Sequence, residues 1–80
     1  MKILVVDDHA LVREGLCQIL QGLDENIEVY EAADCAAAFE VASLHNDLDL
    51  VLLQIPMVKL MEWVLGLLLT SGAILLPITM

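Results

Sequence analysis

Two adjacent carboxylates near the start of the chain are the residues best placed to do chemistry. Asp7 and Asp8 directly follow residues 3–6, a continuous apolar run that is typical of a strand buried on both faces. Neighbouring carboxylates repel each other, and a divalent cation held through oxygen ligands offsets that charge. In the alternative explanation, Asp8 caps the helix that follows and Asp7 is solvated. The dipeptide by itself leaves both explanations open.

His9 completes this polar group, and we expect it to begin the following helix at the surface. A role as a third metal ligand or an acid–base group is the alternative, but Mg²⁺ takes oxygen ligands. The sequence contains no evident Ser/His/Asp or Cys/His set and no glycine-rich phosphate loop, so we do not expect an enzyme. Cys17 and Cys35 lack zinc-type spacing, and they fit a cytoplasmic protein with reduced thiols.

The segments that must position these residues alternate between strand-like and helix-like patterns. After His9, apolar residues recur at helical spacing as far as residue 23. Residues 27–32 alternate like a strand, Asp34 can cap a second helix, and residues 48–53 form a third strand-like run. The order β-α-β-α-β predicts an α/β fold with a parallel sheet.

Functional groups of such sheets gather at the carboxyl ends of the strands. In this chain those ends carry Asp7, Asp8 and Gln54. We therefore expect these three side chains to lie at one edge of the sheet.

Charge is distributed unevenly along the 80 residues, which have a formal net charge of −9 and a hydrophobic fraction of 60%. The apolar content excludes a disordered acidic tail, and the negative charge argues against direct nucleic-acid binding. Residues 1–50 contain 11 acidic and 2 basic side chains, whereas residues 51–80 contain one of each. The strand-like and helix-like patterns also end near Pro56, and we therefore divide the chain into a first part, residues 1–57, and an apolar tail, residues 58–80.

Three stretches of the first part resemble the receiver domain of bacterial response regulators. Residues 2–16 read KILVVDDHALVREGL and closely resemble the opening of that domain, above all in the subfamily with a LuxR-type helix-turn-helix output. The stretches EAAD at residues 31–34 and DLVLL at residues 49–53 fit the same family. The resemblance ends at about residue 57 and implies the N-terminal half of a flavodoxin-like parallel sheet.

The resemblance also implies a site and a partner. In this family a sensor histidine kinase passes a phosphoryl group to an Asp that ends the third strand, beside Mg²⁺ held by the acidic pair. Asp8 resembles the direct metal ligand and Asp7 its water-mediated partner, but Gln54 stands at the phosphoacceptor position. Because an amide is a poor nucleophile and carries no charge, we predict no phosphorylation at Gln54 and weakened Mg²⁺ binding.

The apolar tail departs from the family pattern, and we expect it to be largely helical and to support self-association. Residues 74–79 slightly resemble the family's fourth strand, with Thr79 as the candidate phosphoryl contact, although Pro77 suits a central strand badly.

In a shifted reading frame, the codons for residues 61–64 can encode the Asp/Asn-Gly pair that the family pattern expects. We interpret the chain as a truncated receiver domain, frameshifted after about residue 57, whose intact relatives regulate transcription.

Two other functions stay open. Residues 63–80 contain 18 uncharged positions, close to the ~20 of a transmembrane span, so a small membrane-associated protein with Trp63 at the interface is one alternative. The Gly, Ser, Thr and Pro residues of this segment and the receiver-like start argue against it. The other alternative is an interaction module with the same fold that works without phosphorylation.

Overall fold

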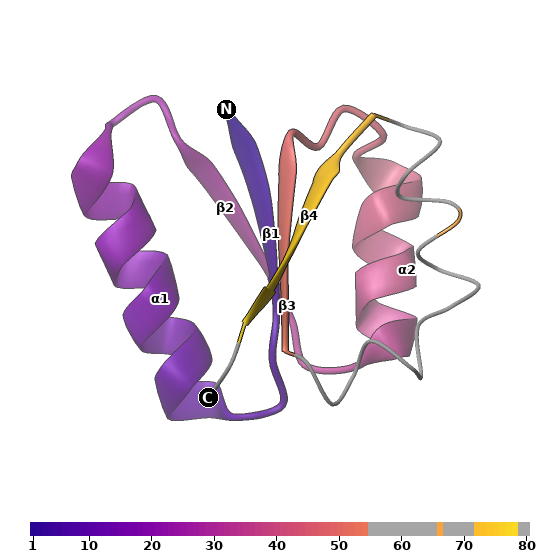
Figure 1. Cartoon of the computed structure of the whole chain (residues 1–80), viewed down its shortest axis with the longest axis horizontal. Coiled ribbons are helices and arrows are strands. Elements are labelled where there is room, and N and C mark those ends of the chain that lie inside the picture. Colours follow the sequence, from indigo (N-terminus) through magenta and orange to yellow (C-terminus); the bar gives the residue numbers. More distant parts are fainter. Residues whose placement is uncertain (55–65, 67–71, 79–80) are drawn as a thin grey trace.

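The computed structural model describes residues 1–54, 66 and 72–78, in which a parallel sheet lies between two helices (Figure 1). The elements in chain order are β1 (Lys2–Val6), α1 (Ala10–Leu23), β2 (Glu28–Ala32), α2 (Cys35–Leu44), β3 (Leu50–Gln54) and β4 (Ile74–Ile78). The strand order is β2-β1-β3-β4, with α1 on one face of the sheet and α2 on the other. The predicted α/β fold, a partial flavodoxin-like parallel sheet, is confirmed.

β1 lies inside the sheet and is buried on both faces. On one face Leu4 belongs to an apolar cluster with Ala38 of α2. On the other face Val5 belongs to a second cluster with Cys17 of α1. Because both faces are covered by a helix, residues 3–6 are apolar without the alternation that a half-exposed strand shows.

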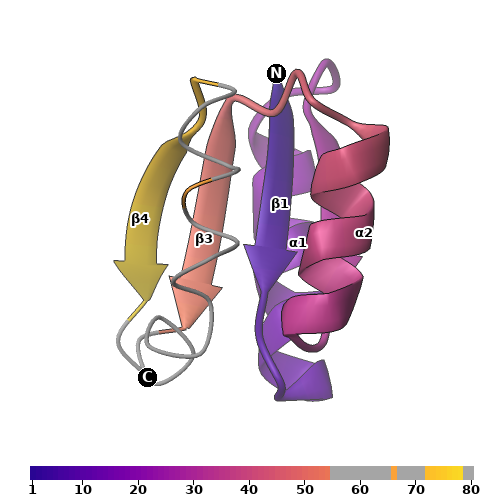
Figure 2. The ribbon, with the colours of Figure 1, turned by 90° about the vertical axis from the view of Figure 1, so that its right-hand side faces the viewer.

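β3 lies between β1 and β4, and all three strands run in the same direction (Figure 2). In the register between β1 and β3, Val6 lies beside Leu53. The residues that follow this pair are Asp7 and Gln54, so the sheet register brings them to the carboxyl ends of two hydrogen-bonded strands. This register is what positions the site described below.

Residues 74–78 form the strand β4, in agreement with the slight resemblance of residues 74–79 to the family's fourth strand, and the prediction of a largely helical tail is wrong for this segment. β4 runs parallel to β3, with Leu53 beside Pro77. The N–H of Ile74 donates to the carbonyl of Asp49 (3.0 Å), and the alternation along a parallel strand then turns the backbone of Pro77 away from β3. A residue without an N–H is tolerated there because β4 is the last strand of the described sheet.

The two helices begin in different ways. The side chain of Asp34 accepts a hydrogen bond from the N–H of Ala37 (2.8 Å), so Asp34 caps α2 as predicted. The N-cap residue of α1 is His9, and its side chain makes no capping hydrogen bond. The explanation in which Asp8 caps this helix is therefore wrong.

The part of the chain that the structure describes contains no helix long and apolar enough to cross a membrane. Most of the span considered at residues 63–80, including Trp63, lies outside the described residues.

Candidate functional site

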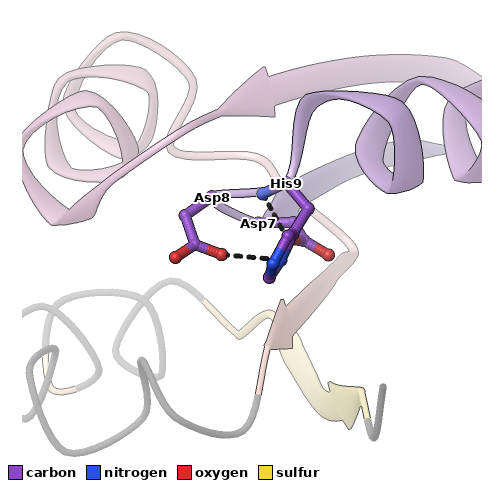
Figure 3. Close-up of side chains that lie close together, drawn as sticks. All are labelled: Asp7, Asp8 and His9. Carbon is purple, nitrogen blue, oxygen red and sulfur yellow. Dashed lines mark hydrogen bonds and ion pairs between the residues drawn. The ribbon is translucent and has the colours of Figure 1, made fainter.

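The carboxyl ends of β1 and β3 bring four polar residues together. Asp7, Asp8 and His9 follow β1, and Gln54 ends β3, 45 residues after His9. One ligand atom from each of Asp7, Asp8 and His9 lies within 4.8 Å of the others (Figure 3). The structure thus places Asp7, Asp8 and Gln54 at the edge of the sheet where the sequence predicts them.

Asp7 is the buried member of this group, with no exposed surface. Its Oδ1 accepts the backbone N–H of His9 (2.8 Å), and its own N–H donates to the carbonyl of Ala32 (3.1 Å). Its Oδ2 has no hydrogen-bond partner among the described residues. Such a buried, unpaired oxygen costs about 1–3 kcal/mol of stability. The explanation in which Asp7 is simply solvated is therefore wrong.

Asp8 and His9 form the exposed side of the group, and each side chain is 62% exposed. Oδ1 of Asp8 lies 3.0 Å from Nδ1 of His9, and Oδ1 of Asp7 lies 3.3 Å from the same nitrogen. His9 begins the helix at the surface, as predicted. Its ring, however, faces the two carboxylates, which the sequence pattern does not indicate (Figure 3).

Gln54 is 5% exposed, and its Nε2 lies 3.3 Å from Nδ1 of His9. Its buried Oε1 has no hydrogen-bond partner in the described part of the chain. Nδ1 cannot accept a hydrogen from Gln54 and donate one to Asp8 at the same time. Rotation of the amide group by half a turn about the Cγ–Cδ bond of Gln54 exchanges the positions of its nitrogen and oxygen. Oε1 then faces Nδ1–H of His9. The Gln54 amide can therefore offer His9 either a donor or an acceptor.

Arg13 is a positioning residue that sequence reasoning missed. Its Nη1 donates to the backbone carbonyl of Asp7 (2.7 Å), and its Nε donates to Oε1 of Glu31 (3.2 Å). These two contacts tie the first turn of α1 to the ends of β1 and β2. The sequence spacing indicates this position, because Arg13 lies one helical turn after His9 and therefore on the same side of the helix.

The donor atoms of this group can hold a divalent cation, but they differ from the all-oxygen ligand set that Mg²⁺ prefers. Mg²⁺ takes an octahedral shell of oxygens, usually from carboxylates, phosphates and water. Asp7 and Asp8 are the carboxylates that would hold it. The predicted phosphoacceptor position holds a neutral amide, Gln54, instead of a third carboxylate. The other ligand atom nearby is a nitrogen, Nδ1 of His9. The predicted phosphoryl contact, Thr79, lies outside the described residues.

The fold and the acidic end of β1 agree with the comparison to protein families. The sequence profile of the response regulator receiver domain matches residues 3–70. The chain belongs to this family, whose members are the receiver domains of two-component signalling. The match extends beyond residue 57, and the division of the chain at that residue stays a prediction.

Two curated relatives give the comparison at the level of single proteins. The chain is 41% identical over 56 residues to the glycerol metabolism activator of Pseudomonas putida, which is 70% of this chain and 25% of that protein. It is 42% identical over 57 residues to the nitrate/nitrite response regulator protein NarP of Escherichia coli K12, covering 70% and 26%. The chain therefore spans about a quarter of the length of these relatives. No solved structure matches it.

Proposed function

We propose that this chain is a receiver domain that binds its signalling partners without accepting a phosphoryl group. The single observation that supports this function is Gln54 at the carboxyl end of β3. It stands where the family pattern has its phosphoacceptor carboxylate, and its amide is held against His9 rather than free in solvent.

The chemistry of the amide supports the proposal. Attack on phosphorus needs a nucleophilic oxygen, and the amide oxygen of Gln54 is weakly nucleophilic because, unlike a carboxylate oxygen, it carries no negative charge. Transfer also needs positive charge to offset the phosphoryl oxygens. With Gln54 neutral, Asp7 and Asp8 are the two carboxylates left to hold Mg²⁺, so the affinity for this ion is weakened. The chain itself catalyses no reaction in this proposal.

Its partners follow from the family and from the exposed apolar surface. A sensor histidine kinase is the expected upstream partner, and the function belongs in the cytoplasm. The family resemblance suggests a descent from proteins that regulate transcription, and the names of the two relatives, an activator and a response regulator, are in keeping with a regulatory role. Self-association is a further expectation, because Ile74 and Leu76 of β4 are exposed.

A phosphodonor assay tests the proposal. The full chain is incubated with Mg²⁺ and acetyl phosphate, and intact-protein mass spectrometry measures any phosphoryl adduct. We expect no adduct on the wild-type chain. The matched variant Gln54→Asp restores a carboxylate at the same position and is expected to gain a hydroxylamine-sensitive adduct. A hydroxylamine-sensitive adduct on the wild-type chain would refute the proposal.

A further inference from the structure

One face of β4 is apolar and largely exposed. Ile74 is 63% exposed and Leu76 is 47% exposed. In register they lie beside Leu50 and Leu52 of β3, which pack against the apolar cluster under α1. Neighbouring residues of a parallel sheet lie on the same face, so Ile74 and Leu76 extend this apolar face beyond the helix. In Figure 2, α1 lies behind β1, whereas β4 lies on the far side of β3.

The helix α1 has an exposed apolar flank, formed by Ile19 (64% exposed) and Leu23 (71% exposed). Cys17 faces the sheet, and both Cys17 and Arg13 lie beside Glu31 of β2. Ile19 follows Cys17 by two residues, about 200° around the helix, and Leu23 lies one turn after Ile19. This flank therefore faces away from β2, on the side of α1 where β3 and β4 lie.

The flank of α1 and the exposed face of β4 complement each other between two copies of the chain. An apolar sheet face needs a helix to cover it, and the flank of a second α1 is an apolar helix surface. The four exposed side chains present roughly 500 Å² in each copy, which is within the range of the largest apolar patches of monomers. Two copies that face each other thus bury about 1,000 Å², the least that a specific interface needs.

Charge and backbone hydrogen bonding also favour contact through this face. The chain has a net charge of −9, so two copies repel each other wherever their acidic surfaces meet. All five residues of β4 are uncharged, as are Ile19 and Leu23. The open edge of β4 is less suited to pairing, because Pro77 has no N–H to donate to a further strand. A second copy is therefore expected on the face of the sheet and not as an extension of its edge.

We propose that two copies of this chain associate about a two-fold axis, with the α1 flank of each copy over Ile74 and Leu76 of the other. Such a contact is made twice, and it uses both surfaces of both copies, so the assembly stops at a dimer. The dimer goes beyond the proposed function, because it requires no phosphoryl group and no metal.

Complementation between two charged variants of the full chain tests this dimer. Ile19→Glu and Leu76→Lys each place an unpaired charge in both contacts of a homodimer. In a mixed dimer, the introduced lysine meets the introduced glutamate in one contact, and the other contact keeps the native leucine and isoleucine. Leu44→Lys is the matched control, because Leu44 is exposed at the end of α2, on the opposite face of the sheet (Figure 1).

Sedimentation velocity measures the dimer dissociation constant, and far-UV circular dichroism checks the fold of each variant. The neutral variants Ile19→Gln and Leu76→Gln replace a charged variant that does not fold. We expect a wild-type dimer whose dissociation constant rises at least about tenfold in each single variant, because each loses the burial of one large apolar side chain. The equimolar mixture recovers at least about tenfold in affinity over either variant alone, and Leu44→Lys retains the wild-type affinity.

Three results would overturn the proposal: a wild-type chain that stays monomeric, assemblies larger than a dimer, or a mixture that associates no more tightly than its separate components. None of these bears on the proposed function, which is measured by phosphoryl adducts.

Discussion

The amide nitrogen of Gln54 lies 3.3 Å from Nδ1 of His9, although 45 residues separate them in the chain. This contact joins the carboxyl end of β3 to the start of α1. It shows that the glutamine does not merely replace a carboxylate at this position, because it has its own partner in the site. The predictions below begin with this residue.

Restoring a carboxylate at position 54 is expected to destabilise the protein in the absence of a cation. Gln54→Asp places a second buried negative charge beside Asp7, and the repulsion lowers the free energy of unfolding at neutral pH by about 1–3 kcal/mol. The repulsion raises the pKa of the introduced carboxyl, so the lost stability is regained as the pH falls and that carboxyl becomes protonated. Urea denaturation with and without Mg²⁺ measures this, with Gln54→Asn as the neutral control. Equal stability of the Asp and Asn variants at neutral pH would contradict the prediction.

The cap of α2 gives a second prediction. The side chain of Asp34 satisfies the N–H of Ala37, so Asp34→Ala is expected to lower the free energy of unfolding by about 1 kcal/mol. Asp34→Asn keeps an acceptor oxygen and is expected to retain most of that stability. Thermal denaturation of the two variants makes the comparison, and an Asn variant as unstable as the Ala variant would argue against the cap.

The packing of β3 gives a third prediction. Leu53 is fully buried in the cluster under α2, and Leu53→Ala is expected to cost about 2–5 kcal/mol because a cavity remains. Leu44 is largely exposed at the end of α2, and Leu44→Ala is expected to change stability by no more than about 0.5 kcal/mol. Chemical denaturation measures both changes. Similar losses in the two variants would mean that β3 does not pack as described.

The buried thiol of α1 gives a prediction about pH. Burial raises the pKa of Cys17 from 9.0 to about 11, with Glu31 as a further cause. Its thiolate fraction at neutral pH is then about a hundredfold below that of an unperturbed thiol, so iodoacetamide labels it slowly in the folded chain. Because the folded-state pKa is the higher one, the contribution to stability is complete below about pH 9 and is lost as the pH rises toward 11. Denaturation at the low and high ends of this pH range, with Cys17→Ala as the control, measures whether the free energy of unfolding falls as the pH rises.

The exposed apolar residues of β4 give a prediction about self-association. Ile74 and Leu76 lie in register beside Leu50 and Leu52 of β3, on the face of the sheet that α1 partly covers. Burying each side chain contributes about 1.5–3 kcal/mol, so Ile74→Thr combined with Leu76→Thr is expected to weaken self-association by at least about tenfold.

Light scattering coupled to size exclusion measures the oligomeric state of this double variant. Leu11→Thr is the matched control, because Leu11 is an exposed apolar residue of a different element, α1. A wild-type chain that is already monomeric, or an equal effect of the control, would contradict the prediction.

The sequence by itself determined the order of the first five elements and the end of the sheet at which the site lies. Residues 3–6 are apolar without alternation because two helices cover β1, and that pattern is local enough to be recognised in one short run. The cap at Asp34 is also a local feature, since its donor lies three residues away. Family resemblance then placed Asp7, Asp8 and Gln54 in one site.

Only the tertiary structure decided what depends on contacts between distant residues. An apolar tail has the same composition whether it forms a helix or a strand, and pairing with β3 selects the strand at residues 74–78. Likewise, His9 faces the carboxylates and Gln54 because the β1–β3 register brings both strand ends together. The contact of Arg13 with the carbonyl of Asp7 likewise depends on the packing of α1 beside the end of β1. Periodicity records which face of an element is apolar, whereas the partner of a polar side chain is fixed only when the strands are in register.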